Sequence, residues 1–193
     1  MLYNKHNLDV AKIAAKTGYR PELAGVLFTK DKTVATDSFR LLEVSVRSDV
    51  NVADFPQIQG VSAMRGCDPF IVNAKVLREI KIPKASTPII ENVAIKHLTA
   101  GGVEFFTTDL QGVDVKSAPR IEGKFPDYEQ IIPKGAPVAE MIVNGKLLGE
   151  LLEIMAKLSP REEVKIKFYG SYKPLVLEAG NDTQKSRGLM MGI

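Results

Sequence analysis

The sequence has little of what most metal and thiol chemistry needs: one cysteine, two histidines and no tryptophan in 193 residues. A lone cysteine excludes an internal disulfide and a metal site built from several thiolates, and it fits a reducing cytoplasm. His6 and His97 stand in unrelated contexts, so we expect surface residues and no histidine ligand pair. No metal-ligand spacing is present, and the sequence predicts no metal site.

Long apolar runs are also missing. No stretch of about 18 apolar residues occurs, so no membrane-spanning helix is expected. The first ten residues lack the cationic and then apolar pattern of a secretory signal. With 45% hydrophobic and 25% charged residues, the composition is that of a globular protein. We therefore expect a cytoplasmic protein with no membrane partner.

No constellation typical of an active site is present. Gly101-Gly102 has the character of a hairpin turn and opens no helix, so it is not a phosphate-binding loop. Asp37 and Asp109 each follow a threonine in a repeated turn, where an aspartate commonly accepts hydrogen bonds from backbone amides. The sequence thus predicts a binding protein that needs no cofactor, and not an enzyme.

What the sequence does contain is a repeat. A short strand, an amphipathic helix and extended strands recur about every 70 residues. Helical spacing of apolar residues predicts helices over residues 8–17, from Ala74 to just before Pro83, and over residues 146–158. Short apolar strands are expected before the second and third helices, at residues 70–72 and 141–143.

The extended segments after the first two helices match each other. Pro21 and Pro88 are 67 residues apart, and the Thr-Asp pairs that begin at Thr36 and Thr108 are 72 residues apart. Each Thr-Asp pair is expected at a turn between paired strands. The chain therefore contains three copies of a strand–helix–strands unit, here called a half-unit. This repeat predicts an α+β fold with helices on one face of antiparallel sheets. An odd copy is left without a partner.

Two motifs resemble signatures of a known family. Thr33-Val-Ala-Thr-Asp-Ser-Phe-Arg-Leu-Leu42 is similar to V-A-T-D-G-H-R-L of the bacterial DNA sliding clamp, the ring-shaped processivity subunit of the replicative polymerase. Glu122-Gly-Lys-Phe-Pro-Asp-Tyr-Glu-Gln-Ile-Ile-Pro133 resembles the family's G-R-F-P-D-Y signature. Residues 174–178 and 189–193 are similar to its last strands. The resemblance covers essentially the whole chain.

The resemblance implies a DNA-clamp fold with a particular domain organisation. Residues 1–133 correspond to one complete domain, similar to the middle domain of the family. Residues 134–193 correspond to the second half of the last domain. Relative to the usual three-domain subunit, the first domain and half of the last are absent. A homo-oligomer is expected, either a two-fold dimer or a four-chain ring whose half-units match those of a family ring.

The resemblance also implies a peptide-binding cleft, into which a DNA polymerase or other clamp-binding proteins insert a short linear motif. An apolar pocket with a few polar anchors and adaptable methionines suits such ligands. The alternative is that these positions are strand, turn and core residues without a ligand. The matching positions are Thr36, Ser38, Phe39, Arg40, Leu41, Pro126, Gln130, Ile131, Leu147, Pro174, Met190 and Met191.

In the clamp family the helices face duplex DNA and contact its phosphates without reading sequence. The net charge of this chain, +3 from 26 basic and 23 acidic residues, does not by itself indicate nucleic-acid binding. Lys12 and Lys16 are expected on one face of the first helix, four residues apart. A solvated basic face is the alternative. The candidate DNA-binding residues are Lys12, Lys16, Arg20, Lys75, Arg78, Lys81 and Lys84.

The predicted function is a clamp-like tether that binds duplex DNA without sequence specificity and docks replication or repair proteins. The alternative is a clamp-derived adaptor or decoy, which binds clamp-interacting peptides or a complete clamp without encircling DNA. The oligomeric mass in solution separates the two, because a monomer cannot surround a duplex.

Overall fold

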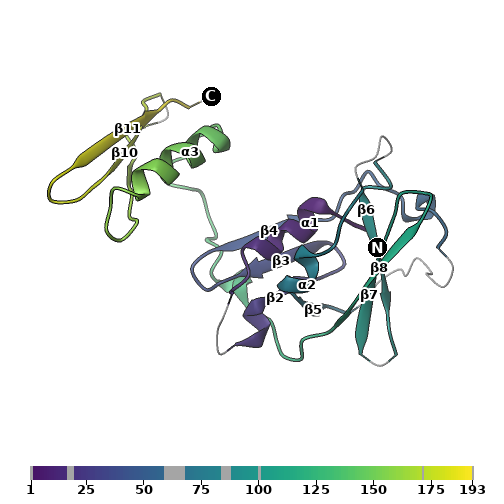
Figure 1. Cartoon of the computed structure of the whole chain (residues 1–193). Coiled ribbons are helices and arrows are strands. Elements are labelled where there is room, and N and C mark those ends of the chain that lie inside the picture. The colour runs from purple at the N-terminus through teal and green to yellow at the C-terminus, as the bar shows by residue number, and fades with distance from the viewer. Residues whose placement is uncertain are drawn as a thin grey trace. The chain divides into compact units, whose positions relative to one another are not determined.

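The computed structural model describes residues 2–16, 20–58, 68–83, 88–99, 101–170 and 172–192. The chain divides into two compact units, Met1–Asp127 and Tyr128–Ile193, here called unit 1 and unit 2 (Figure 1). The division falls within the second family signature, at residues 122–133.

The described residues of unit 1 form two four-stranded antiparallel sheets, in the orders β1-β6-β7-β8 and β4-β3-β2-β5. The strands are β1 (Leu2–Asn4), β2 (Gly25–Phe28), β3 (Lys32–Thr36), β4 (Leu41–Ser45), β5 (Phe70–Asn73), β6 (Asn92–His97), β7 (Gly102–Thr108) and β8 (Val113–Pro119). The helices are α1 (Lys5–Asp9), continued by a 3-10 turn (Val10–Lys12), and α2 (Ala74–Arg78), with further 3-10 turns at Pro21–Ala24 and Val52–Asp54.

The strand that precedes each helix of unit 1 joins the sheet of the other half-unit. β1 pairs with β6, with Tyr3 opposite Val93, and β5 pairs with β2, with Val72 opposite Val26. All four of these side chains are at most 1% exposed and belong to one hydrophobic cluster. Because each half-unit lends a strand to the other, the two share a single core.

In unit 2 the described residues form one helix on one sheet. Helix α3 (Gly145–Ala156) packs on a three-stranded antiparallel sheet in the order β11-β10-β9. Met155 of α3 is buried with Leu175, Leu177 and Met190 of the sheet. The strands are β9 (Lys165–Lys167), β10 (Leu175–Gly180) and β11 (Lys185–Met190), and a 3-10 turn lies at Tyr128–Gln130.

The three α-helices of the described residues all begin after an asparagine. The side-chain oxygens of Asn4, Asn73 and Asn144 each accept a hydrogen bond from a backbone N–H in the first turn of the helix. These N–H groups have no partner within the helix, so the cap satisfies them. The asparagines are 69 and 71 residues apart and mark the same point of the repeat. A leucine stands four residues after each: Leu8, Leu77 and Leu148.

The first helix corrects our prediction of residues 8–17. It begins at Lys5, because Asn4 and Asn7 each accept a hydrogen bond from the other's backbone N–H, both at 3.1 Å, and so fix the first turn. It ends with the 3-10 turn at Lys12. Apolar spacing locates the buried face of a helix but not its first residue, which the cap decides. The second predicted helix is confirmed at its start, Ala74, but α2 ends at Arg78, so the extension to Pro83 is wrong. The third helix is confirmed as α3, and the strand at residues 70–72 is confirmed as β5.

The strand predicted at residues 141–143 is wrong for the structure of this single chain. Residues 141–143 have no regular secondary structure, and none of the described strands pairs with them. The corresponding strands β1 and β5 exist because a second half-unit offers each of them an edge. Unit 2 contains one half-unit, so the segment has no such edge within it.

The two Thr-Asp pairs form the same turn, as predicted. The hydroxyl of Thr36 donates to the carbonyl of Arg40 at 2.8 Å, and that of Thr108 donates to the carbonyl of Gly112 at 2.7 Å. Both hydroxyls also accept a backbone N–H two residues later, at 3.2 and 3.0 Å. Both threonines are buried, so these bonds replace water that the hydroxyls have lost.

The aspartates of these turns cap backbone amides, which was the role predicted for them. Asp37 and Asp109 each accept two backbone N–H groups, at 2.8–3.0 Å. The next residues, Ser38 and Leu110, have φ of 79° and 74°. Such left-handed backbone is unfavourable for residues other than glycine, so the hydrogen bonds of the aspartate side chains help to hold both turns.

We expect Thr108→Ala to lower the free energy of unfolding by about 1–2 kcal/mol, because the carbonyl of Gly112 and the backbone N–H of Leu110 both lose a partner. Thr99 is exposed, and Thr99→Ala should change the unfolding free energy by less than about 0.5 kcal/mol. Urea denaturation measures both. Equal effects of the two substitutions would show that the turn hydrogen bonds contribute nothing.

The turn also predicts a pH effect. Backbone hydrogen bonds from Gly112 and Gln111 lower the pKa of Asp109 in the folded chain. Its contribution to stability is therefore present above the usual pKa of a carboxyl group and is lost as the pH falls through the lowered value. In Asp109→Asn the side-chain oxygen still accepts but does not titrate. The melting temperature should fall less steeply between about pH 5 and pH 1 for this variant than for the natural chain.

Candidate functional site

The helices of unit 1 lie side by side on one face of that unit (Figure 1). The guanidinium of Arg78, in the last turn of α2, donates to the carbonyl of Ala11 in the 3-10 turn that follows α1. Carbonyls at the end of a helix lack an intrahelical donor, so this bond satisfies one of them. It also ties the two half-units together on the helical face.

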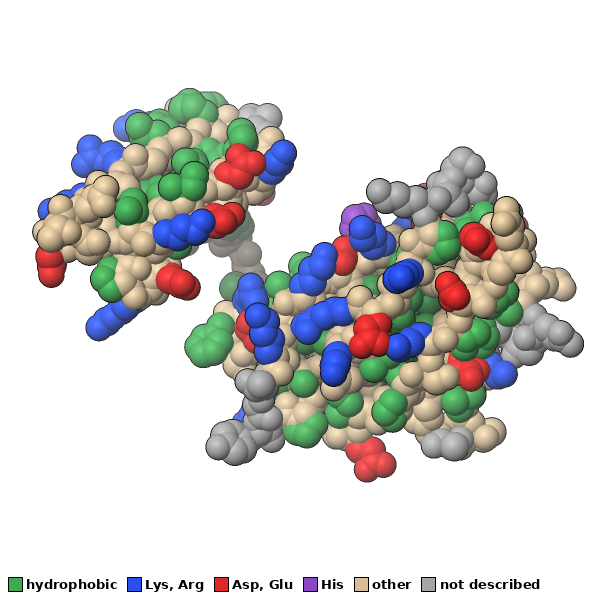
Figure 2. Space-filling view, in the orientation of Figure 1, with side chains coloured by type: hydrophobic (Ala, Val, Ile, Leu, Met, Phe, Trp, Pro, Cys, Tyr) green, Lys and Arg blue, Asp and Glu red, His purple; other side chains and the backbone are tan. Residues whose placement is uncertain are grey.

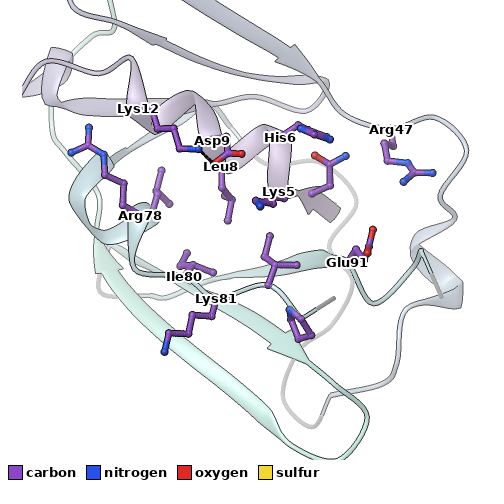
Figure 3. A pocket seen from close by; sticks show the side chains of 14 residues that line it. Lys5, His6, Leu8, Asp9, Lys12, Arg47, Arg78, Ile80, Lys81 and Glu91 are labelled. Atoms are coloured by element: carbon purple, nitrogen blue, oxygen red, sulfur yellow. Dashed lines mark ion pairs between the residues drawn. The ribbon is translucent and has the colours of Figure 1, made fainter. Parts of the chain in front are cut away.

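A hollow of about 610 Å³ opens beside these helices (Figure 3). Leu8, Leu77, Ile80 and Ile82 supply much of its apolar lining. Its charged lining consists of five basic residues, Lys5, Lys12, Arg47, Arg78 and Lys81, and two acidic ones, Asp9 and Glu91. We call this site the basic hollow.

Positive charge is concentrated at the basic hollow. Its excess of three basic residues over acidic ones equals the net charge of the whole chain. Figure 2 shows Lys and Arg side chains gathered on the face of unit 1 that carries α1 and α2. The near-neutral composition therefore conceals one basic face.

Most of this charge is free to meet a ligand. Lys5 and Lys81 are exposed and form no ion pair within the described part of the chain. Lys12 pairs with Asp9 at 2.8 Å (Figure 3), but such an exposed pair is worth little and exchanges readily. Arg47 is the least available of the five to a ligand, because it pairs with Asp49.

Only some of the predicted DNA-binding residues lie at the basic hollow. Lys12, Arg78 and Lys81 line the basic hollow. Lys16, Arg20 and Lys75 are exposed elsewhere, and Lys84 lies outside the described residues. The expectation that Lys12 and Lys16 share a helix face is wrong, because the first helix ends at Lys12.

Two basic residues of the hollow were missed. Lys5 would have been found by aligning Asn4 with Asn73 and Asn144, which places Lys5 at the start of the first helix. Arg47 gives no such signal. It follows β4, which is held to the first helix because the buried amide of Asn7 donates to two carbonyls at the end of β4, at 3.0 and 3.2 Å.

The residues that the resemblance assigns to a peptide-binding cleft come from both units. In unit 1, the Thr36–Leu41 turn presents Phe39, which is 97% exposed. Thr36 is buried in the turn, and Arg40 pairs with Asp37 at 2.9 Å. Ser38 is exposed, whereas Leu41 and Pro126 are half-buried. The exposed phenylalanine is the member of this group best placed to contact a ligand.

In unit 2 three of the assigned residues, Pro174, Met190 and Met191, lie at one end of the sheet. Met190, 7% exposed, packs in the core opposite Leu175. The same register puts Pro174 and Met191 beyond that pair, with Met191 63% exposed. Leu147, in the first turn of α3, is 52% exposed. Gln130 and Ile131, at the end of a 3-10 turn, are also exposed.

The described residues contain no group of three or more His, Cys, Asp or Glu side chains that could hold a metal ion. Nor does that part of the chain contain a helix long and apolar enough to cross a membrane.

The sequence matches no family model and no curated protein. Solved structures do match it. The DNA polymerase sliding clamp of Bacillus subtilis gives a TM-score of 0.71 at 18% identity, over 100% of this chain and 48% of that one. The sliding clamp of Pseudomonas aeruginosa gives 0.67 at 20% identity, over 99% and 50%. The DNA polymerase III beta chain of Streptococcus pneumoniae gives 0.66 at 18% identity, over 100% and 48%.

These similarities establish the fold. The chain has the α+β fold of the sliding clamps and spans about half the length of the clamp chains it matches. Both the predicted fold class and the predicted resemblance are confirmed at this level.

Proposed function

We propose that this chain, which has the fold of the bacterial sliding clamps, acts in the cytoplasm as a clamp-like tether. In this function it binds duplex DNA without sequence specificity and docks replication or repair proteins, among them a DNA polymerase. The observation that carries the proposal is the basic hollow, where the charge excess of the whole chain is found beside the paired helices.

The chemistry of the hollow suits the DNA backbone. Lysine and arginine side chains reach phosphates through long flexible stems, and their contacts carry no sequence information. Two exposed lysines that form no ion pair with the described residues, Lys5 and Lys81, line the hollow together with an arginine that is fixed by its bond to Ala11. A surface of this kind gives weak binding that falls with salt, which is what a protein that moves along DNA requires.

We expect Lys5→Glu with Lys81→Glu to weaken duplex binding at least about tenfold and to flatten its salt dependence, because each phosphate contact contributes about 0.9 to the slope of log K against log salt. Lys30→Glu with Lys124→Glu makes the same change in net charge at exposed positions outside the hollow. Fluorescence anisotropy with a short labelled duplex compares the two. If the pairs weaken binding equally, the hollow is not the DNA site.

The second half of the proposal is a peptide-docking surface on unit 2. Pro174 and Met191 offer half-buried and exposed apolar area next to the buried Met190, and Leu147 of α3 is also exposed. A methionine can adapt its flexible side chain to varied apolar ligands, and such anchors usually dominate peptide binding. In unit 1, Phe39 offers a separate exposed aromatic ring.

We expect Met191→Ala to raise the dissociation constant of a clamp-binding polymerase peptide about tenfold, which corresponds to about 1.4 kcal/mol. Phe39→Ala tests the unit 1 turn separately. Val115→Ala, at a half-exposed apolar position on β8, is the control and should leave the affinity unchanged. Changes at Met190 are unsuitable, because they would disturb the core of unit 2.

The same titrations decide between the tether and its alternative. Peptide binding together with salt-sensitive duplex binding supports the tether. Peptide binding with no duplex affinity at low salt would instead identify an adaptor or decoy that competes with complete clamps for their partners.

A further inference from the structure

Unit 2 repeats the strand order of each half-unit of unit 1. In all three copies the second and third strands are joined by a turn of the same length. The residues that close these turns are Thr36 and Leu41, Thr108 and Val113, and Gly180 and Lys185. With these turns aligned, β9 of unit 2 corresponds to β2 and β6 of unit 1.

The alignment identifies one strand position that is buried in both half-units of unit 1 but exposed in unit 2. Ile166 of β9 lies opposite the residue three positions before the turn, as Phe28 of β2 and Ile95 of β6 do. Phe28 is 0% exposed and Ile95 is 7% exposed, whereas Ile166 is 43% exposed. Two residues earlier in β2 and β6, Val26 and Val93 are 0% exposed, while the corresponding Val164 is half-buried.

A strand from the other half-unit supplies the cover in unit 1. β5 places Phe70 directly opposite Phe28, with the two rings stacked at 5.1 Å between centroids. β1 covers β6 in the same way. The outer edge of β9 has no strand beside it among the described residues. Its backbone groups are therefore open to pairing.

The segment that should supply such a strand is present in unit 2 and is unused. Residues 141–143 directly precede the cap Asn144, as β5 precedes α2. Met141 and Val143 are turned to the unit 2 core, as Phe70 and Val72 are turned to the unit 1 core, and Ile142 between them is 70% exposed. Within the described chain, residues 138–143 form no backbone hydrogen bond.

We infer that unit 2 is an interaction surface for a second copy of this chain, and that residues 141–143 of each copy add as an antiparallel strand to β9 of the other. Transfer of the β5–β2 register puts Val143 opposite Val164 of the partner subunit and Met141 opposite Ile166 of the partner subunit. Strand addition supplies backbone hydrogen bonds, and alternate side chains supply specificity. The arrangement is reciprocal, as a two-fold dimer requires.

Charge selects this occupant over an arbitrary strand. The outer edge of β9 carries Lys165 and Lys167, and edge lysines discourage promiscuous strand pairing. The same register puts Glu140 opposite Lys167 of the partner subunit, so the incoming segment brings a second carboxylate to a lysine that already pairs with Glu178 at 2.7 Å. Cross-strand pairs of opposite charge are favourable.

The dimer uses neither the basic hollow nor the unit 2 residues proposed to dock a peptide, so its failure and the failure of the proposed function are distinguishable. Cysteine cross-linking tests its register. In a Cys67→Ser background, Val143→Cys with Val164→Cys places two thiols on directly opposed residues, within the Cα separation of a disulfide. We expect most of the oxidised protein to run at twice the chain mass of 21.2 kDa on a non-reducing gel.

The matched control is Val143→Cys with Lys165→Cys, which shifts the register by one residue and puts the thiols on opposite faces. It should cross-link poorly, as should each single-cysteine variant. Equal cross-linking by both pairs, or a product of single-chain mass from the first pair, would overturn the inferred register.

Light scattering at micromolar concentration tests the association itself, and the natural chain should show the mass of two copies. Ile166→Lys should raise the dissociation constant of the dimer at least about tenfold, because it buries a charge in the exchanged core. The residue is partly exposed in one copy, so far-UV circular dichroism should stay unchanged. Leu189 is 61% exposed on the opposite edge strand, so Leu189→Lys should leave the measured mass at that of two copies. A natural chain of single mass would overturn the inference, whatever duplex binding shows.

Discussion

The exchange of one strand between half-units is the constraint on which unit 1 depends. A single half-unit has a sheet whose first strand lacks a neighbour, so its apolar face cannot be closed from within. In unit 1, β1 and β5 cross to the other sheet, and the core-facing residues opposite them, Val26, Phe28 and Val93, are 0% exposed. One core results where two incomplete ones would otherwise lie open to water.

The basic hollow is a consequence of that exchange. Each exchanged strand leads directly into a helix, so the crossing brings the starts of α1 and α2 onto the same face. Lysines that are far apart in the sequence, such as Lys5 and Lys81, then line one site. The clustering of charge therefore comes from topology, which explains why a net charge of +3 gave no sign of it.

The parts that could be predicted from the sequence were those encoded locally. The Thr-Asp turns depend on side chains bonding within four residues of themselves, and the long apolar stripe of α3 is visible in any helical reading. The start of α1 was missed because the cap, and not the apolar pattern, decides it. The approach of Arg47 to the helices could not be predicted, because it depends on Asn7 bonding to a strand 37 residues away.

Residues 70–72 and 141–143 show which features of a strand can be predicted from local sequence. Both segments are apolar, and both directly precede the asparagine that caps a helix. Only the first is a strand, because it has an edge to pair with. A strand is stabilised by hydrogen bonds to a neighbour, so its sequence can specify the capacity to be a strand but not the partner. The secondary structure of the second segment thus depends on what binds β9.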